Sequence, residues 1–305
     1  MTLSQLVYAV TVAEKKSMNK AAAELFVSQP ALSGAIRDLE EELHTQIFLR
    51  SNKGIVITAE GEEFLSYASN YDSNNPHISM KISHILRVME WSKKIAESLN
   101  LSQEDIELAT LIGLLHDLAR FEQRRLYNTF SDRKSVDHGD LAVTILEENE
   151  YIRKYIEDNQ YDNIIKTAVK NHNKFKIEEG LDERTLLHSQ IVRDADKLDI
   201  MYEGVHMFYN TPNEIEQIES LAIAPEYYEQ FMQSKQIFRK ENPSVLDEMI
   251  CLISFIFDLN FNYSKKVILN ENYINDILDR FNFKNEKTKM QIDEIKNIVN
   301  EYLKK

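Results

Sequence analysis

The chain has 305 residues, 43% hydrophobic and 28% charged, a composition typical of a soluble globular protein with about two domains. Only seven glycines and five prolines are present, which argues against an all-β fold rich in tight turns. A single cysteine, Cys251, excludes an intramolecular disulfide and a thiolate zinc site. The net charge of −14 disfavours non-specific binding to nucleic acid or anionic lipid. No apolar stretch approaches the ~20 residues that a membrane helix needs, so we expect a cytoplasmic protein with no membrane partner.

The first part of the chain predicts three short helices. Apolar residues recur at helical spacing from Leu3 to Ala13. Ser17 is a candidate N-cap for a second helix, and Ser28 is a candidate N-cap for a third, which carries Pro30 in its first turn. Phe26 and Val27 form the turn between the second and third helices.

The third helix has two different faces, and a hairpin follows it. One face is apolar, and the opposite face carries Gln29, Ser33 and Arg37 at positions i, i+4 and i+8. Phe48-Leu-Arg50 and Ile55-Val-Ile57 flank Asn52-Lys-Gly54, which is a hairpin signal. Together these elements predict a winged helix-turn-helix.

A polar segment, residues 69–76, predicts a linker that ends in Pro76. It separates an N-terminal domain, residues 1–68, from a C-terminal domain, residues 77–305. Helical patterns dominate the second domain, with helices expected near 78–99, 102–120, 139–156, 161–172, 183–206, 212–236, 243–258 and 271–302. The predicted fold class is therefore mainly α, with an all-α second domain.

The segment Ser28 to Glu40 closely resembles the recognition helix of LysR-type transcriptional regulators, and so do its flanks at 21–25, 47–50 and 57–61. The resemblance covers about residues 1–66. It implies that the recognition helix contacts the major groove of double-stranded DNA and that Arg50 of the wing contacts phosphate. The implied DNA-binding residues are Ser28, Gln29, Pro30, Ser33, Arg37 and Arg50. Hydrogen-bonding side chains on this face suit base edges and phosphates. The alternative is a winged helix that serves only for protein–protein contact or dimerisation.

Histidine and aspartate residues recur in a suggestive order in the second domain: His84, His116-Asp117, His138, His172 and Asp196. His84 shares a helical face with Val88, Trp91 and Ile95, which predicts that it points inward. His116 and Asp117 follow an apolar helix at 108–115. An ionisable pair buried without partners is costly, and a metal ion would remove that cost.

Three blocks of the second domain look like those of HD-domain phosphohydrolases: His84 to Val88, Leu114 to Gln123 and Arg193 to Asp199. The similarity runs over about residues 77–210. It implies an all-α HD-type helical bundle in which His84, His116, Asp117 and Asp196 bind one divalent metal. His138 and His172 match the extra histidines of the two-metal branch, in which Asp117 bridges both ions.

This resemblance implies an enzyme in which metal-activated water attacks a phosphoryl group. Candidates to neutralise phosphate oxygens are Arg120, Lys134, Arg193 and Lys197, and Glu122 is the candidate to protonate the leaving group. Arg120 and Lys197 could instead hold carboxylates in place. The nitrogen and oxygen ligands suit manganese, iron, cobalt, nickel, zinc or magnesium.

The leading hypothesis is thus hydrolysis of a phosphomonoester or phosphodiester, with nucleotides among the candidate substrates. In the alternative hypothesis the chain is a LysR-like transcriptional regulator whose HD domain senses a phosphorylated ligand without turnover. In a third hypothesis the winged helix serves only for oligomerisation. A homodimer of the chain is a candidate assembly.

Overall fold

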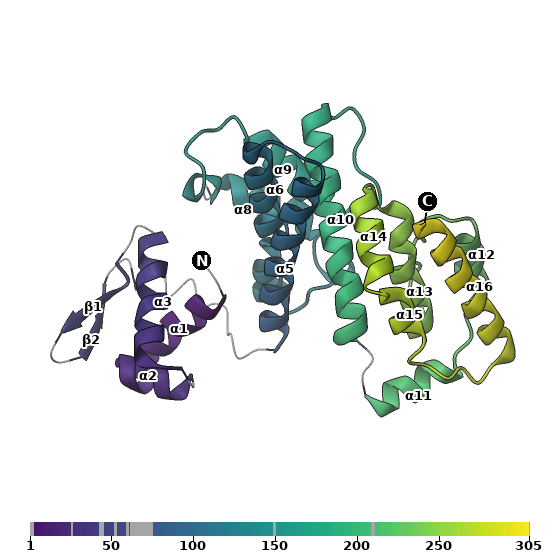
Figure 1. Ribbon diagram of the computed structural model, residues 1–305, viewed down its shortest axis with the longest axis horizontal. Coiled ribbons are helices and arrows are strands. Elements are labelled where there is room, and N and C mark those ends of the chain that lie inside the picture. The colour runs from purple at the N-terminus through teal and green to yellow at the C-terminus, as the bar shows by residue number, and fades with distance from the viewer. Residues whose placement is uncertain are drawn as a thin grey trace. The chain divides into compact units, whose positions relative to one another are not determined.

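The computed structural model describes residues 3–25, 27–42, 46–51, 54–58, 61, 76–148, 151–208 and 211–304. Its contacts divide the chain into two compact units, residues 1–83 and 84–305 (Figure 1). The predicted linker, residues 69–76, lies outside the described residues except for Pro76, which begins helix α5 (Pro76–Ser98). Helix α5 therefore runs across the division between the two units.

The first unit contains three helices and a hairpin: α1 (Leu3–Lys15), α2 (Met18–Glu24), α3 (Gln29–Glu42), β1 (Phe48–Ser51) and β2 (Gly54–Ile57). The two strands are antiparallel, with Phe48 opposite Ile57. Ser17 accepts a hydrogen bond from the Lys20 amide at the start of α2, as an N-cap does. The predicted winged helix-turn-helix is confirmed.

A small apolar core holds these elements together. It contains Ala9 and Val12 of α1, Leu32 and Ile36 of α3, and Phe48 of β1, all buried. The hairpin is also tied to α3 by a side chain, because Oε1 of Glu40 accepts from the amides of Ile47 and Phe48 at 2.8 Å each. The wing is therefore fixed relative to the predicted recognition helix.

The regular elements described in the second unit are all helical, which confirms the predicted class. After α5 they are α6 (Gln103–Leu115), α7 (Ala119–Tyr127), η1 (Asp132–Lys134), α8 (His138–Glu148), η2 (Tyr151–Lys154), α9 (Asp162–Asn171), α10 (Glu183–His206), α11 (Pro212–Ser220), α12 (Pro225–Met232), α13 (Val245–Ile253), η3 (Ser254–Asp258), α14 (Asn262–Asn270), α15 (Tyr273–Leu278) and α16 (Glu286–Leu303).

Several of the expected helices are each divided into shorter ones, and the regions near 139–156 and 243–258 each end in a short 3₁₀ helix, η2 and η3. The helix expected near 102–120 stops at Leu115, and a turn carries the chain into α7. The helix expected near 212–236 is interrupted before Pro225, since proline lacks the amide proton that would continue the helical hydrogen bonds. The region 271–302 follows the end of α14 (Asn262–Asn270) and contains α15 and α16; the amides at the start of α16 are capped by Asn285.

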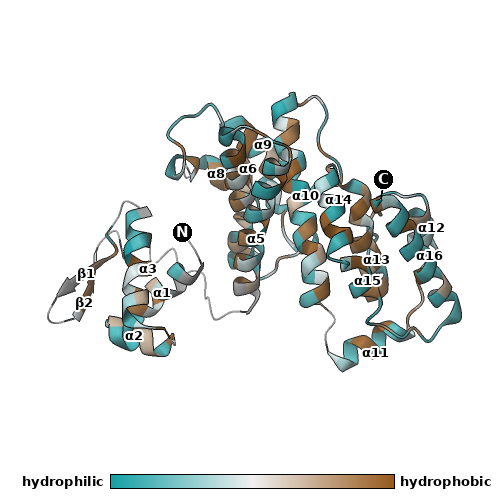
Figure 2. Ribbon diagram, in the orientation of Figure 1, coloured by the Kyte–Doolittle hydropathy of each residue, from teal (hydrophilic) through white to brown (hydrophobic). Residues whose placement is uncertain are grey.

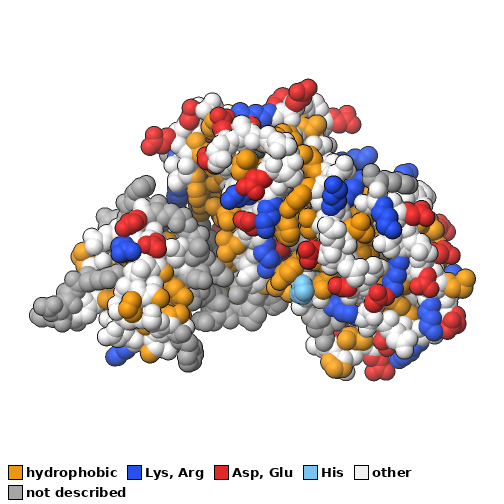
Figure 3. Space-filling view, in the orientation of Figure 1, with side chains coloured by type: hydrophobic (Ala, Val, Ile, Leu, Met, Phe, Trp, Pro, Cys, Tyr) orange, Lys and Arg blue, Asp and Glu red, His pale blue; other side chains and the backbone are white. Residues whose placement is uncertain are grey.

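Helix α10 is the shared central element of the second unit. Figure 1 shows α5, α6, α8 and α9 on one side of it and α13 to α16 on the other. Apolar residues of α10, such as Ile191, Leu198 and Met201, are fully buried and join one continuous core with the C-terminal helices. The hydrophobic faces turn inward in Figure 2. In Figure 3 acidic and basic side chains are interspersed over the visible C-terminal face.

Among the described residues, no helix combines the length and hydropathy needed to cross a bilayer.

Candidate functional site

Six side chains predicted as metal ligands converge within the second unit from five different helices. Five are buried, and only the Asp196 side chain is appreciably exposed, at 17%. They come from α5 (His84), the end of α6 (His116 and Asp117), the start of α8 (His138), the end of α9 (His172) and the middle of α10 (Asp196). We call these six residues the His-Asp cluster.

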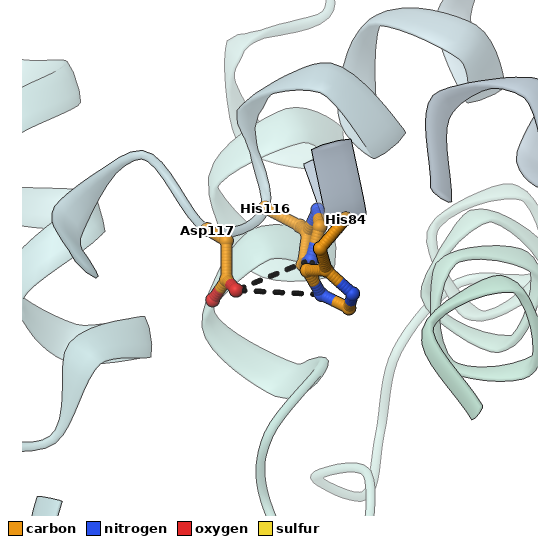
Figure 4. Close-up of side chains that lie close together, drawn as sticks. All are labelled: His84, His116 and Asp117. Atoms are coloured by element: carbon orange, nitrogen blue, oxygen red, sulfur yellow. Dashed lines mark hydrogen bonds and ion pairs between the residues drawn. The ribbon is translucent and has the colours of Figure 1, made fainter. Parts of the chain in front are cut away.

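One half of the His-Asp cluster gathers around Oδ2 of Asp117. This oxygen lies 3.4 Å from Nε2 of His84 and 3.7 Å from Nε2 of His116 (Figure 4). Oδ1 of Asp196 approaches the same two nitrogens, at 3.2 and 3.9 Å. The two Nε2 atoms are 3.3 Å apart. Four ligand atoms therefore face a common point.

The other half gathers around the second oxygen of the same carboxylate. Oδ1 of Asp117 lies 3.2 Å from Nε2 of His138 and 3.6 Å from Nε2 of His172. These two Nε2 atoms are 2.9 Å apart. Asp117 thus stands between two histidine pairs and turns one oxygen toward each.

Two of the histidines are oriented by carboxylates through their other ring nitrogen. Nδ1 of His84 is 2.6 Å from Oδ2 of Asp199, and Nδ1 of His138 is 2.7 Å from Oδ2 of Asp132. A carboxylate accepts hydrogen bonds, so it favours the tautomer with the proton on Nδ1.

The other two histidines are oriented by backbone carbonyls. Nδ1 of His116 donates to the Gly113 carbonyl at 2.7 Å, and Nδ1 of His172 donates to the Val169 carbonyl at 2.6 Å. A neutral imidazole with its proton on Nδ1 has a lone pair on Nε2. In this neutral tautomer each of the four Nε2 atoms would present a lone pair to the cluster, and in each half two Nε2 atoms lie close together.

Two glycines allow the helices to approach closely enough for this convergence. A Cβ on Gly113 of α6 would lie 2.6 Å from Oγ of Ser92 and 2.9 Å from Cα of Met89 on α5. A Cβ on Gly139 of α8 would lie 2.8 Å from the Lys170 carbonyl of α9. The first close approach brings together the helices that carry His84 and His116, and the second brings together those that carry His138 and His172.

The local electrostatics favour bound positive charge. Burial lowers the pKa of His116 to about 3, so this imidazole stays neutral. The pKa of His138 is raised although burial opposes this, because Asp117 and Asp132 both stabilise its charged form. The pKa of Asp196 is lowered, also against burial, by its contact with His84. A divalent cation among these groups would supply positive charge beside the carboxylates and would bind the ring nitrogens that face one another. The residues present therefore fit one or two such ions.

Arg87, Asp199 and Glu203 form a supporting network that the sequence reasoning missed. The guanidinium of Arg87 donates to both oxygens of Asp199 and to Oε1 of Glu203, the last at 3.0 Å. Both acids are buried. Their spacing carried a signal, since Asp199 and Glu203 follow Asp196 at i+3 and i+7 on one face of α10.

Asp132 anchors the opposite side of the His-Asp cluster. Besides His138, it accepts from Nη1 of Arg120 at 2.8 Å and from Nε2 of Gln123 at 2.9 Å. Nε of Arg120 also donates to Oδ1 of Asp117 at 3.2 Å. This geometry supports the second of the two roles considered for Arg120, in which it holds carboxylates in place.

Arg193 and Lys197, two of the predicted phosphate-binding residues, both contact Asp258, and Arg193 also donates to the His172 carbonyl at 3.3 Å. Arg193 is buried and donates to the carbonyls of Asn171 and Lys174 and to Asp258. Nζ of Lys197 lies 2.7 Å from the same Asp258 oxygen. Their charges therefore hold two parts of the chain against α10: the residues that follow α9, and η3.

Glu122 of α7 is the residue predicted to protonate the leaving group. Its carboxylate pairs with Arg125 on the same helix, and this contact lowers its pKa, whereas a proton donor to a leaving group needs a raised one. Lys134 is exposed at the end of η1. His188, which the sequence analysis did not assign to the site, is buried and pairs with Asp105 at 3.0 Å.

The predicted DNA-reading face of α3 is partly solvent-exposed. Ser28 caps the helix by accepting from the Ala31 amide, and Nε2 of Gln29 donates to Oγ of Ser33 at 2.7 Å. The side chain of Arg37 is 67% exposed and lies 3.5 Å from Asp38 and 3.7 Å from Glu41.

A pocket of about 560 Å³ lies between α3 and β1 and includes Pro30, Ser33 and Arg37 in its lining. These three residues are therefore brought onto one concave surface. The side chain of Arg50 lies outside the described residues, so its predicted phosphate contact stays a prediction.

Comparison with known families gives one match for each unit. Residues 3–62 match the bacterial regulatory helix-turn-helix protein, LysR family, and residues 82–201 match the HD domain. No solved structure matches the chain.

The curated relatives are named as transcriptional regulators. The chain is 38% identical over 96 residues to the uncharacterized HTH-type transcriptional regulator YkuM of Bacillus subtilis, an alignment that spans 32% of this chain and 33% of the relative. It is 38% identical over 95 residues to the HTH-type transcriptional regulator BenM of Acinetobacter baylyi, spanning 31% and 30%. The chain thus covers about a third of the length of these relatives. The protein therefore joins a LysR-family helix-turn-helix, at residues 3–62, to an HD domain, at residues 82–201.

Proposed function

We propose that the protein is a metal-dependent phosphohydrolase that acts on a phosphomonoester or phosphodiester. The observation that supports this most strongly is the position of Asp117, which turns one carboxylate oxygen toward each of two buried histidine pairs. A buried carboxylate with histidine ring nitrogens on both sides of it suits a ligand set for one or two divalent ions.

In this proposal His84, His116, Asp117 and Asp196 hold one divalent ion, and Asp117, His138 and His172 hold a second. When bound, such ions lower the pKa of a water molecule and polarise a phosphoryl group. Asp196 is the most exposed member of the His-Asp cluster, so we place the approach of the substrate on its side.

The neighbouring residues of the chain keep the ligands in position. Asp199 and Asp132 hold His84 and His138 with Nε2 directed into the cluster. Arg120 bridges Asp117 and Asp132, which restricts rotation of the central carboxylate. A fixed ligand geometry matters because catalysis by a metal site depends on orientation of its first ligands by the residues behind them.

The test is metal content by elemental mass spectrometry together with a screen of phosphomonoesters and phosphodiesters. Asp117→Asn and His116→Ala should lose both metal and turnover. The matched control is Asp105→Asn, which alters a carboxylate that also pairs with a buried histidine but lies outside the His-Asp cluster. Undiminished turnover in Asp117→Asn, or no retained metal in the wild type after incubation with manganese or iron, would overturn the proposal.

A second candidate function is transcriptional regulation, favoured by the LysR-family match and by the exposed Arg37 on α3. In this candidate the HD domain senses a phosphorylated ligand without hydrolysing it, and double-stranded DNA is the partner. DNA binding that changes with metal or ligand, in the absence of any turnover, would select this function over the first.

A further inference from the structure

Asn173 directly follows His172 in the chain and binds the two acids that flank His138 in the fold. Its Nδ2 atom donates to Oδ1 of Asp137 at 3.0 Å and to Oδ2 of Asp132 at 3.2 Å. His172 ends α9, and His138 begins α8. One amide group therefore ties the chain just after α9 to the segment that leads into α8.

The two acids control different features of His138. Asp137 accepts from two backbone amides in the first turn of α8, at 2.9 and 3.1 Å, so it caps the helix that His138 begins. Asp132 accepts from Nδ1 of His138 and so sets the orientation of the ring. Because Asn173 binds both acids, it restrains the backbone of His138 and the direction of its ring together.

The contact with Asp132 falls on the oxygen that orients the histidine. Oδ1 of Asp132 is held by Arg120 and Gln123, at 2.8 and 2.9 Å. Oδ2 of Asp132 accepts from Nδ1 of His138 at 2.7 Å and from Asn173. Removal of the Asn173 amide would therefore loosen this second oxygen and leave the first oxygen in place.

The amide of Asn173 is turned so that its nitrogen meets the acids. The reverse orientation would set its oxygen against two carboxylates, which only accept hydrogen bonds. In the described part of the chain, Oδ1 of Asn173 is buried without a hydrogen-bond partner, which costs stability. This oxygen faces Gly139, where a Cβ would lie 2.6 Å from it. The side chain is thus placed to bind the two acids rather than to pair all of its own polar atoms.

We propose that Asn173 is the positioning residue for the half of the His-Asp cluster that contains His138 and His172, and that it sets the affinity of this half for the second divalent ion. His172 and Asn173 are consecutive, so the amide that restrains His138 also fixes the two histidines relative to one another, with their Nε2 atoms 2.9 Å apart. The inference rests on the proposed function for the presence of the second ion, but binding of that ion needs no turnover.

The first experiment is a calorimetric titration of the metal-free, full-length protein with Mn²⁺. The wild type should bind two ions. Asn173→Ala and Asn173→Leu should each weaken binding of the second ion about 10- to 100-fold and leave that of the first unchanged. Leucine resembles asparagine in shape but has no hydrogen-bonding side-chain atom. Agreement between the two variants would therefore attribute the effect to the lost donor rather than to a cavity.

The matched control is Asn171→Ala, which alters the asparagine on the other side of His172. The Asn171 side chain is buried and binds only backbone in the contacts found, the Thr167 carbonyl and the Glu178 amide, both at 2.9 Å. Urea denaturation should show that Asn171→Ala lowers stability, while the titration should show that it keeps both ions. An equal loss of the second ion in Asn171→Ala would overturn the proposal, because general damage to the end of α9 would then explain the effect.

The second experiment uses Co²⁺, whose visible absorption depends on coordination geometry. The absorption added by the second equivalent of Co²⁺ should change in Asn173→Ala, and that added by the first equivalent should not. Wild-type affinity for the second ion in Asn173→Ala, or a single ion in the wild type, would overturn the proposal. A second ion that is lost in Asn173→Ala, without turnover of any phosphoester by the wild type, would support the role of Asn173 and reject the hydrolase.

Discussion

Oδ2 of Asp199 accepts a hydrogen bond from Nδ1 of His84 at 2.6 Å, although the two residues are 115 positions apart. The same carboxylate is bound by Arg87. Arg87, Asp199 and His84 therefore form a connected series of polar groups that ends in the His-Asp cluster. This arrangement directs Nε2 of His84 toward Asp117 and Asp196. It also leads to predictions about residues that do not themselves touch a metal.

Asp199→Asn should weaken metal binding about 10- to 100-fold, because an amide no longer stabilises the tautomer of His84 that presents a lone pair at Nε2. The measurement is a competition titration with a chromophoric chelator. Asp105→Asn, which alters the carboxylate beside His188, should leave the metal affinity unchanged. Equal affinities in wild type and Asp199→Asn would show that Asp199 does not orient a ligand.

Arg87→Met should lower the free energy of unfolding of the metal-free protein by about 3 kcal/mol, since it leaves the buried carboxylates of Asp199 and Glu203 without their cation. Urea denaturation in the presence of a chelator measures this loss. The control is Arg125→Met, which removes an ion pair in which the arginine side chain is 57% exposed and should cost at most about 1 kcal/mol. A similar small effect for both variants would contradict the prediction.

His172→Ala should reduce the metal content from two ions per chain to one, because it removes a ligand atom from only one half of the His-Asp cluster. Elemental mass spectrometry of the purified variants gives the stoichiometry. His188→Ala alters a buried histidine outside the cluster and should retain both ions. A single ion in the wild type would instead assign the metal to the half with four ligand atoms. His138 and His172 would then belong to the substrate pocket.

The Cys251 thiol should react slowly with thiol reagents in the folded protein. Burial raises its pKa to about 12, and only the thiolate is nucleophilic, so at pH 8 about one thiol in 10⁴ is ionised. The rate with a disulfide reagent should increase with pH up to at least pH 10, and unfolding in guanidinium should restore the ordinary rate. A native thiol that reacts as fast as the unfolded one would be inconsistent with this burial.

Arg37→Ala should weaken binding to specific DNA about tenfold or more, because Arg37 is the exposed cation on the predicted reading face of α3. Duplexes enriched by the full-length wild type from a random-sequence pool serve as the probe in a mobility-shift titration at fixed salt. Arg125→Ala removes an exposed arginine of the second unit and is the control. If the wild type enriches no duplex, the DNA-binding proposal fails.

Local sequence signals predicted much of the secondary structure and the members of the His-Asp cluster. Ser17 and Ser28 begin helices where expected, because capping depends on atoms only three residues apart. His84, His116, Asp117, His138, His172 and Asp196 were predicted from their order together with the resemblance to HD-domain phosphohydrolases, and the structure brings all six together.

Only the tertiary structure decided what each charged side chain faces. Arg193, Lys197 and Glu122 carry the charges that the chemistry would need, yet in the fold Arg193 and Lys197 are both bound to Asp258 and Glu122 is bound to Arg125. The spacing of Asp199 from Asp196 places both on one face of α10, but its partner His84 lies 115 residues away and only the fold brings the two together. Periodicity and capping are short-range properties that the sequence determines by itself, whereas orientation and pairing of buried charges depend on which distant helices pack together.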